Sequence, residues 1–177
     1  MKKILYICLA LIILSGIGVG SWFMFGSPGK SSETADISES DKADYSTKTV
    51  SEVFQQLEST KHLAVYYATT PALTQTETGT NVIFFAPNKT AVDTFTKDTA
   101  LGLEKFLPYH VVVSSELPVN VIDGAKLKTV DGQELLVVTA NGDLYLRDAK
   151  GNDVRLRKPI DAKNGKIYVI DKVLLTQ

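Results

Sequence analysis

Few side chains in this sequence have the types and spacing that catalysis or metal binding requires. Its two histidines, His62 and His110, are far apart along the chain, and its single cysteine, Cys8, lies in an apolar run near the N-terminus. Two histidines with no cysteine nearby do not form a recognisable zinc site. The rest of the chain lacks the Gly-x-Ser-x-Gly of a nucleophile elbow and the Gly-x-x-x-x-Gly-Lys of a phosphate loop. We therefore predict no enzyme activity, no metal site and no cofactor, and we rank a hydrolase last among the possible functions.

Two short polar stretches remain as candidate sites. Residues 148–153 place carboxylates around a glycine, but they lack the alternating ligands and final glutamate of a calcium loop, so we interpret them as a solvated turn. Tyr109 and His110 form a polar pair beside three consecutive valines. Because a buried histidine needs partners for its ring nitrogens, we favour a structural role for the pair over contact with a partner.

Length and charge limit the classes of protein to which the chain can belong. The 177 residues suit one domain of ordinary size plus a tether. The formal net charge is −1 and no long basic run is present, which argues against a nucleic-acid partner. Without a cysteine outside the N-terminal run, the domain has no disulfide and its stability must come from an apolar core.

The N-terminal segment predicts attachment to a membrane. Residues 4–26 are almost wholly apolar and follow Lys2 and Lys3. About 20 helical residues cross a bilayer, whereas the apolar region of a cleaved signal has about 7 to 15. We therefore interpret residues 1–26 as an uncleaved signal anchor, and the two lysines place the domain on the extracytoplasmic side of the cell membrane. The alternative is a cleaved signal and a secreted protein.

A polar linker is predicted between the anchor and the domain. Residues 27–47 are rich in Ser, Thr, Gly and charged side chains, with acids outnumbering bases. A segment of this composition buries too little apolar surface to offset the entropy of ordering, so we expect it to be flexible. The domain then occupies residues 48–177.

The first half of the domain has helical patterns around one short strand. Val50, Val53, Phe54 and Leu57 form an apolar stripe that Thr49 or Ser51 can cap. Further helices are expected over residues 62–69, from a cap at Asn88 or Thr90 through Phe95, and over residues 100–107, where Pro108 should end the last of them. Residues 81–86 form the strand.

The second half has the spacing of a β-meander. Glycine-containing turn pairs recur at residues 123–124, 131–132, 141–142, 151–152 and 164–165. Turns at such intervals indicate short antiparallel strands, so the fold class is α+β. We expect a type I′ turn at Asn164-Gly165, because both residues tolerate a positive φ. In the strand that follows, Ile167 and Val169 point one way and Tyr168 the other, so both of its faces should be buried.

Three motifs, in order, resemble those of the fasciclin domain. They are residues 84–92 (Phe-Phe-Ala-Pro-Asn-Lys-Thr-Ala-Val), the pair Tyr109-His110, and residues 164–175 (Asn-Gly-Lys-Ile-Tyr-Val-Ile-Asp-Lys-Val-Leu-Leu). The resemblance covers about residues 48–177. It implies a wedge of two small β-sheets packed with several short helices, in which His110 bonds the first or third motif. It also implies binding roles for Tyr109, His110 and Ile160, since family members use these positions for integrin contact.

The chain departs from the family pattern at two of these places. The third motif usually has histidine where this chain has Tyr168, and the family's Asp-Ile reads Pro159-Ile160 here. Integrin binding is therefore not assumed. The leading hypothesis is a membrane-anchored extracytoplasmic module that mediates cell adhesion by binding an extracellular protein or polysaccharide. The alternative is an envelope module for a small ligand or lipid, which requires an apolar pocket between helices and sheet.

Overall fold

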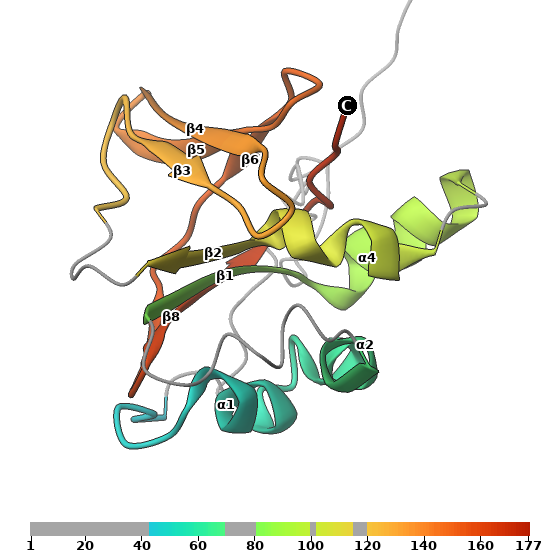
Figure 1. Ribbon diagram of the computed structural model, residues 1–177, viewed down its shortest axis with the longest axis vertical. Coiled ribbons are helices and arrows are strands. Elements are labelled where there is room, and N and C mark those ends of the chain that lie inside the picture. Colours follow the sequence, from blue (N-terminus) through green and yellow to red (C-terminus); the bar gives the residue numbers. More distant parts are fainter. Residues whose placement is uncertain (1–42, 70–80, 100–101, 115–119) are drawn as a thin grey trace, which may run out of the picture. The chain divides into compact units, whose positions relative to one another are not determined.

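The structure, a computed structural model, describes residues 43–69, 81–99, 102–114 and 120–177. The predicted anchor and residues 27–42 of the predicted linker lie outside these ranges. Within them, no helix has the length and apolar character needed to span a bilayer. The described part contains two four-stranded sheets and several short helices (Figure 1), which confirms the α+β class.

The first helices form where the apolar stripe predicted them. Helix α1 (Val50–Gln56) starts at a capping box, in which the Thr49 side chain accepts from the Glu52 backbone and the Glu52 side chain accepts from the Thr49 N–H. Its stripe is buried in the core. A 3₁₀ turn, η2 (Lys61–Leu63), leads into α2 (Ala64–Thr69).

Packing begins before the predicted start of the domain at residue 48. Tyr45, which the sequence pattern assigns to the linker, is only 5% exposed and belongs to the same core as α1. Its carbonyl accepts the Lys48 N–H at 2.9 Å. The packed unit therefore includes at least this part of the predicted linker.

The chain between β1 and β2 contains one element that was predicted correctly and one that was not. Helix α4 (Lys89–Asp98) begins at Asn88, whose Oδ1 accepts from the Ala91 N–H at 2.8 Å, as expected. The helix predicted over residues 100–107 is instead two 3₁₀ turns, η4 (Leu103–Lys105) and η5 (Leu107–His110). Pro108 lies in the first turn of η5 and does not end a helix. Proline is tolerated there because its missing N–H would have had no partner within the turn.

Sheet A carries the first and last of the family-like motifs side by side. Its order is β2 (Val111–Ser114), β1 (Asn81–Pro87), β8 (Gly165–Ile170) and β7 (Ile160–Ala162), and β1 runs parallel to β8. The prediction that β8 is buried on both faces is confirmed. Ile167 and Val169 join the core on the helix side, and Tyr168 and Ile170 join the core shared with the second sheet.

Sheet B is the predicted meander. Its strands follow the chain in antiparallel order: β3 (Lys126–Lys128), β4 (Glu134–Ala140), β5 (Asp143–Arg147) and β6 (Asp153–Arg155). Leu135, Val137 and Leu146 are fully buried in the core that sheet B shares with β1 and β8. The domain thus has one core on each side of sheet A.

The turn predicted at Asn164-Gly165 is a different structure. Positive φ at both residues occurs at Asn141-Gly142, between β4 and β5, with φ values of 53° and 83°. Among the described residues, Asn141 is the only non-glycine with a positive φ, so Asn164 does not form a type I′ turn. The loop between β7 and β8 is Lys163-Asn164, and Gly165 is already paired in β8.

Candidate functional site

Tyr109 and His110 lie at the end of η5, and both are fully buried. The 3₁₀ turn leads directly into β2, which begins at Val111. Burial of this depth means that neither side chain reaches the surface in this conformation. Their predicted structural role is therefore visible in their hydrogen bonds, whereas their predicted binding role stays a prediction.

Each ring nitrogen of His110 has one partner. Nε2 accepts from the backbone N–H of Leu174 at 2.9 Å, and Nδ1 lies 2.8 Å from the carbonyl oxygen of Phe106. Because Nε2 must accept, the proton of the neutral ring is on Nδ1, where it is donated to Phe106. Burial lowers the pKa of His110 to about 4, so the ring is neutral at pH 7. The expected bond to the third motif exists at its end, in Leu174.

The hydroxyl of Tyr109 joins the first residue of β4 to the β5–β6 turn of sheet B. It accepts from the backbone N–H of Ala149 at 2.9 Å and donates to the carbonyl oxygen of Glu134 at 3.2 Å. Burial raises the pKa of Tyr109, which keeps the hydroxyl protonated and able to donate. The hydroxyl is therefore satisfied inside the protein, as the structural role predicted for the Tyr109-His110 pair requires.

Asp148 corrects the interpretation of residues 148–153 as a solvated turn. Its side chain is only 5% exposed. Its Oδ1 accepts from the backbone N–H groups of Lys150 at 2.9 Å and Asn152 at 2.8 Å, and its Oδ2 accepts from Leu175 at 3.1 Å. The first two bonds form an Asx turn, which the order Asp-Ala-Lys-Gly-Asn favours locally. Asp153, in contrast, is exposed and pairs with Arg147 at 2.8 Å.

Ile160 lies apart from the Tyr109-His110 pair. It is 8% exposed on β7, opposite Ile167, and belongs to the core on the helix side of sheet A. Tyr109 belongs to the core on the other side. The structure therefore does not bring the three predicted binding residues into one surface site. Tyr168, where the family usually has histidine, is buried with its ring 5.6 Å from that of Phe85.

An open groove of about 460 Å³ lies at one end of sheet B. Its lining residues come from β3, the β3–β4 turn, the start of β4, the β5–β6 turn and the C-terminal stretch: Lys128, Gly132, Gln133, Glu134, Ala149 and Gln177. Two of them, Glu134 and Ala149, are the partners of the Tyr109 hydroxyl. The buried tyrosine thus positions two walls of a surface groove. The sequence carries no signal for this groove, since its walls come from separate segments.

Metal binding finds no support in the described residues, where no group of three His, Cys, Asp or Glu side chains is placed to hold an ion. The Oγ of Ser59 and of Thr60 and the Nε2 of His62 are buried without a hydrogen-bond partner. His62 is half-buried, and burial and the nearby Lys89 lower its pKa. Because none of these three atoms has a hydrogen-bond partner among the described residues, they do not form a hydroxyl–imidazole pair of the kind that activates a nucleophile.

The first and last of the three motifs are paired as β1 and β8, and the turn that carries Tyr109 and His110 leads into the neighbouring strand β2, in agreement with the resemblance seen in the sequence. The sequence profile described as Fasciclin domain matches residues 47–176. The chain belongs to the fasciclin domain family. A search of curated proteins finds no match.

Comparison with solved structures shows that the chain also has the fold of a fasciclin domain. One similar structure is a FAS1 domain pair from the insect cell adhesion molecule Fasciclin I, with a TM-score of 0.61 and 16% sequence identity. The similarity covers 72% of this chain and 51% of that chain, so the fasciclin domain described here corresponds to about half of the pair. At 16% identity the comparison shows that the two proteins share a fold, and it says nothing of the partners of this chain.

Proposed function

We propose that this fasciclin-domain protein is a non-catalytic module that mediates cell adhesion by binding an extracellular protein or polysaccharide through its surface. One observation carries the proposal. The polar groups of its most distinctive pair, Tyr109 and His110, are all used in internal hydrogen bonds. Together with the family, whose similar structure comes from a cell adhesion molecule, this favours a rigid scaffold that offers its exterior to a partner.

The proposal includes display outside the cell by an N-terminal anchor. It is supported by the apolar run of residues 4–26 and the preceding Lys2 and Lys3. The test is protease treatment of intact cells that express the full chain with a C-terminal tag. We expect loss of the tag and retention of a membrane-bound N-terminal fragment. A protected tag would contradict external display, and a tagged protein in the medium that lacks the N-terminal segment would indicate signal cleavage instead.

Attachment is tested with the full chain on cells. We expect that deleting the protein reduces attachment of cells to matrix or wall material, and that adding it back restores attachment. The groove at the end of sheet B is the first surface to alter, by the double substitution Lys128→Ala and Gln133→Ala. Lys97→Ala, on the exposed side of α4, is the control. Unchanged attachment of cells in the deletion strain would contradict the proposed adhesive function.

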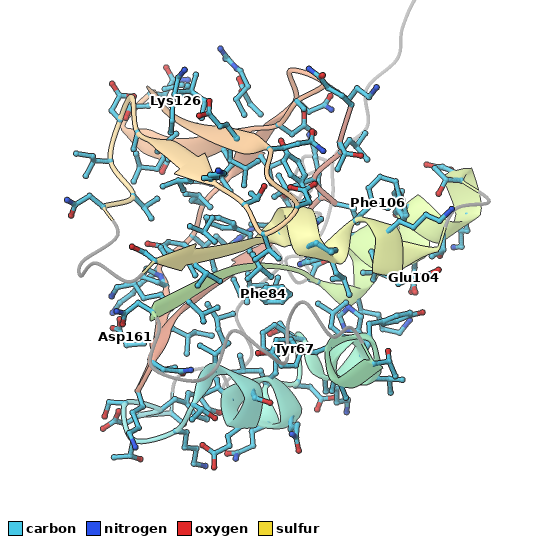
Figure 2. The ribbon with its side chains drawn as sticks, viewed as in Figure 1. Tyr67, Phe84, Glu104, Phe106, Lys126 and Asp161 are labelled. Carbon is cyan, nitrogen blue, oxygen red and sulfur yellow. The ribbon has the colours of Figure 1, made fainter. Side chains whose placement is uncertain are left out.

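The small-ligand or lipid alternative requires an open apolar space between helices and sheet A. That region is instead filled by aromatic side chains, and Figure 2 shows Phe84 of β1 and Tyr67 of α2 facing each other across it. Ring centroids lie 4.5 Å apart between Phe54 and Phe84 and 6.3 Å apart between Tyr67 and Phe84. The described interior therefore does not favour this alternative, and we do not propose it.

A further inference from the structure

The last residues of the chain are held by side chains rather than by a strand. After β8, residues 171–177 form no ladder, yet three of their backbone N–H groups bond to side-chain acceptors. Leu174 donates to Nε2 of His110 at 2.9 Å, and Leu175 donates to Oδ2 of Asp148 at 3.1 Å. Gln177 donates to Oε1 of Gln133 at 3.4 Å. We call residues 173–177 the C-terminal segment.

The C-terminal segment closes both cores. Val173 belongs to the core on the helix side of sheet A, and Leu174, which is fully buried, belongs to the core between the sheets. Gln177 at its end lines the groove of sheet B. Moving this segment would therefore expose apolar surface and remove one wall of the groove.

The bond between His110 and Leu174 exists only when the imidazole is neutral. Nδ1 already carries a proton that is donated to Phe106, so a second proton must go to Nε2. A protonated Nε2 would point a donor at the Leu174 N–H, and two donors would face each other in a buried site. Such a pair costs free energy because neither group finds an acceptor.

Burial and the nearby charges act on the pKa of His110 in opposite directions. Among the described residues, Asp131 in the β3–β4 turn and Asp148 in the β5–β6 turn face the ring, and both carboxylates favour its protonated form. Complete burial outweighs them and lowers the pKa of His110 to about 4. An imidazole released to solvent returns to its ordinary value near 6.5. Acid therefore favours whichever conformation exposes the ring.

We propose that the C-terminal segment is an acid-released latch, in which protonation of His110 breaks its bond to Leu174 and frees residues 173–177 while both sheets stay paired. The sheets stay paired because their ladders are backbone hydrogen bonds that do not titrate. The latch is a property of the fold and does not depend on the proposed adhesive function. Release alters the groove wall and exposes the apolar side chains that the segment covers, so the surface of the domain changes with pH.

The size of the effect follows from the two protonation states. With a pKa of about 4 when closed and 6.5 when open, the ratio of closed to open segment falls roughly a hundredfold between pH 7 and pH 4. The direction is fixed, since the open form binds the extra proton. The latch is closed at neutral pH and weakens as the pH falls through 6.5.

Amide hydrogen exchange on the full chain in detergent micelles tests the latch. NMR protection factors are measured from pH 7 to pH 4 and corrected for the intrinsic rate at each pH. We expect protection of the Leu174 and Leu175 amides to fall roughly a hundredfold while the amides of the β1–β8 ladder keep theirs. An equal fall in the protection of the β1–β8 ladder amides would show global unfolding. Unchanged protection of the Leu174 amide would show that its bond to His110 persists in acid. Either result would overturn the proposal.

Two variants separate His110 from other titrating groups. In His110→Gln the side-chain oxygen can accept from Leu174 but does not titrate, so protection of Leu174 should lose its pH dependence. His62→Gln changes the other histidine, which is half-buried, and should keep the dependence of the wild type. The opposite pattern would assign the transition to His62.

If His110→Gln does not fold, the latch can still be tested by NMR of the His110 ring in the wild-type protein. The ¹⁵N shifts of the His110 ring should report an Nδ1–H tautomer at pH 7 and a protonated ring at acid pH. Protonation must share its midpoint with the loss of Leu174 protection. A ring that stays neutral while Leu174 exchanges freely would rule out the mechanism.

Discussion

The hydroxyl of Tyr109 joins the first residue of strand β4 to the β5–β6 turn, two parts of sheet B that are separate in the sequence. It bonds Ala149 as an acceptor and Glu134 as a donor, inside the core between the sheets. His110, the next residue, bonds Leu174 of the C-terminal segment. The pair that gives the family its central motif therefore ties three separate stretches of chain together. This explains a recurrent Tyr-His pair without a surface contact.

Tyr109→Phe should reduce the free energy of unfolding by about 1 to 3 kcal/mol. The ring still fills its place, but the Ala149 N–H and the Glu134 carbonyl lose a buried partner, and such loss carries the full desolvation cost. Urea denaturation of the full chain measures the change. Tyr145→Phe is the control, since Tyr145 alternates with the core residues Leu144 and Leu146 and should change stability by less than about 0.5 kcal/mol. Equal effects of the two variants would contradict this role for Tyr109.

Asp148→Ala should cost about 2 kcal/mol, because it removes an Asx turn and the acceptor for Leu175. The matched variant Asp153→Ala removes an exposed partner of Arg147 and should cost less than about 1 kcal/mol. Urea midpoints at pH 7 compare the two. If Asp153 were the more sensitive carboxylate, our account of this turn would be wrong.

Residue-scale predictions from sequence worked where the partners were local. The cap at Asn88 bonds a residue three positions away, and short polar side chains before an apolar stripe favour that bond. Asp148 was misjudged because the partner that keeps it buried, Leu175, lies 27 positions along the chain. The groove could not be predicted for the same reason, since sequence patterns do not say which turns meet.

At the scale of elements, strand β8 was predictable and the loop before it was not. A run that is apolar on both faces implies a central strand, and β8 lies between β1 and β7. The Asn-Gly pair before it predicts a type I′ turn, which does not form. The side chain of Asn164 instead accepts the Val50 N–H at 2.8 Å and so holds the start of α1 against the β7–β8 loop. Its neighbour Gly165 allows β8 to approach β1.

Gly165→Ala should destabilise the domain by about 3 kcal/mol or more. A Cβ at this position would lie 1.8 Å from the carbonyl oxygen of Val82, and the β1–β8 ladder would have to move to make room. Gly132→Ala is the control: its φ of +89° carries a backbone cost of about 1 to 2 kcal/mol, but open space surrounds the site. Thermal unfolding of both variants provides the comparison. A larger loss for Gly132 would show that φ, not close approach, selects glycine in this domain.

At the scale of the whole molecule, the family motifs are scaffold. The strands that carry the first and last motifs are adjacent in sheet A, and their side chains supply both cores. The resemblance therefore identified the fold correctly, because core residues and their spacing are what a fold retains. It does not locate a binding surface, since the motif residues on β1 and β8 are mostly buried, and exposed motif residues such as Lys89 and Asp171 lie just beyond those strands.

Ile167→Ala tests this division between scaffold and surface. The side chain is fully buried in the core on the helix side, so its truncation should leave a cavity and cost about 2 to 5 kcal/mol. Val65→Ala, at a position that is 71% exposed, should change stability little. Attachment by the Ile167 variant should fall only in proportion to its unfolded fraction, measured by circular dichroism over the same range of temperature. A variant that stayed folded and lost attachment would place the binding site within the motif itself, because only a direct contact separates binding from folding.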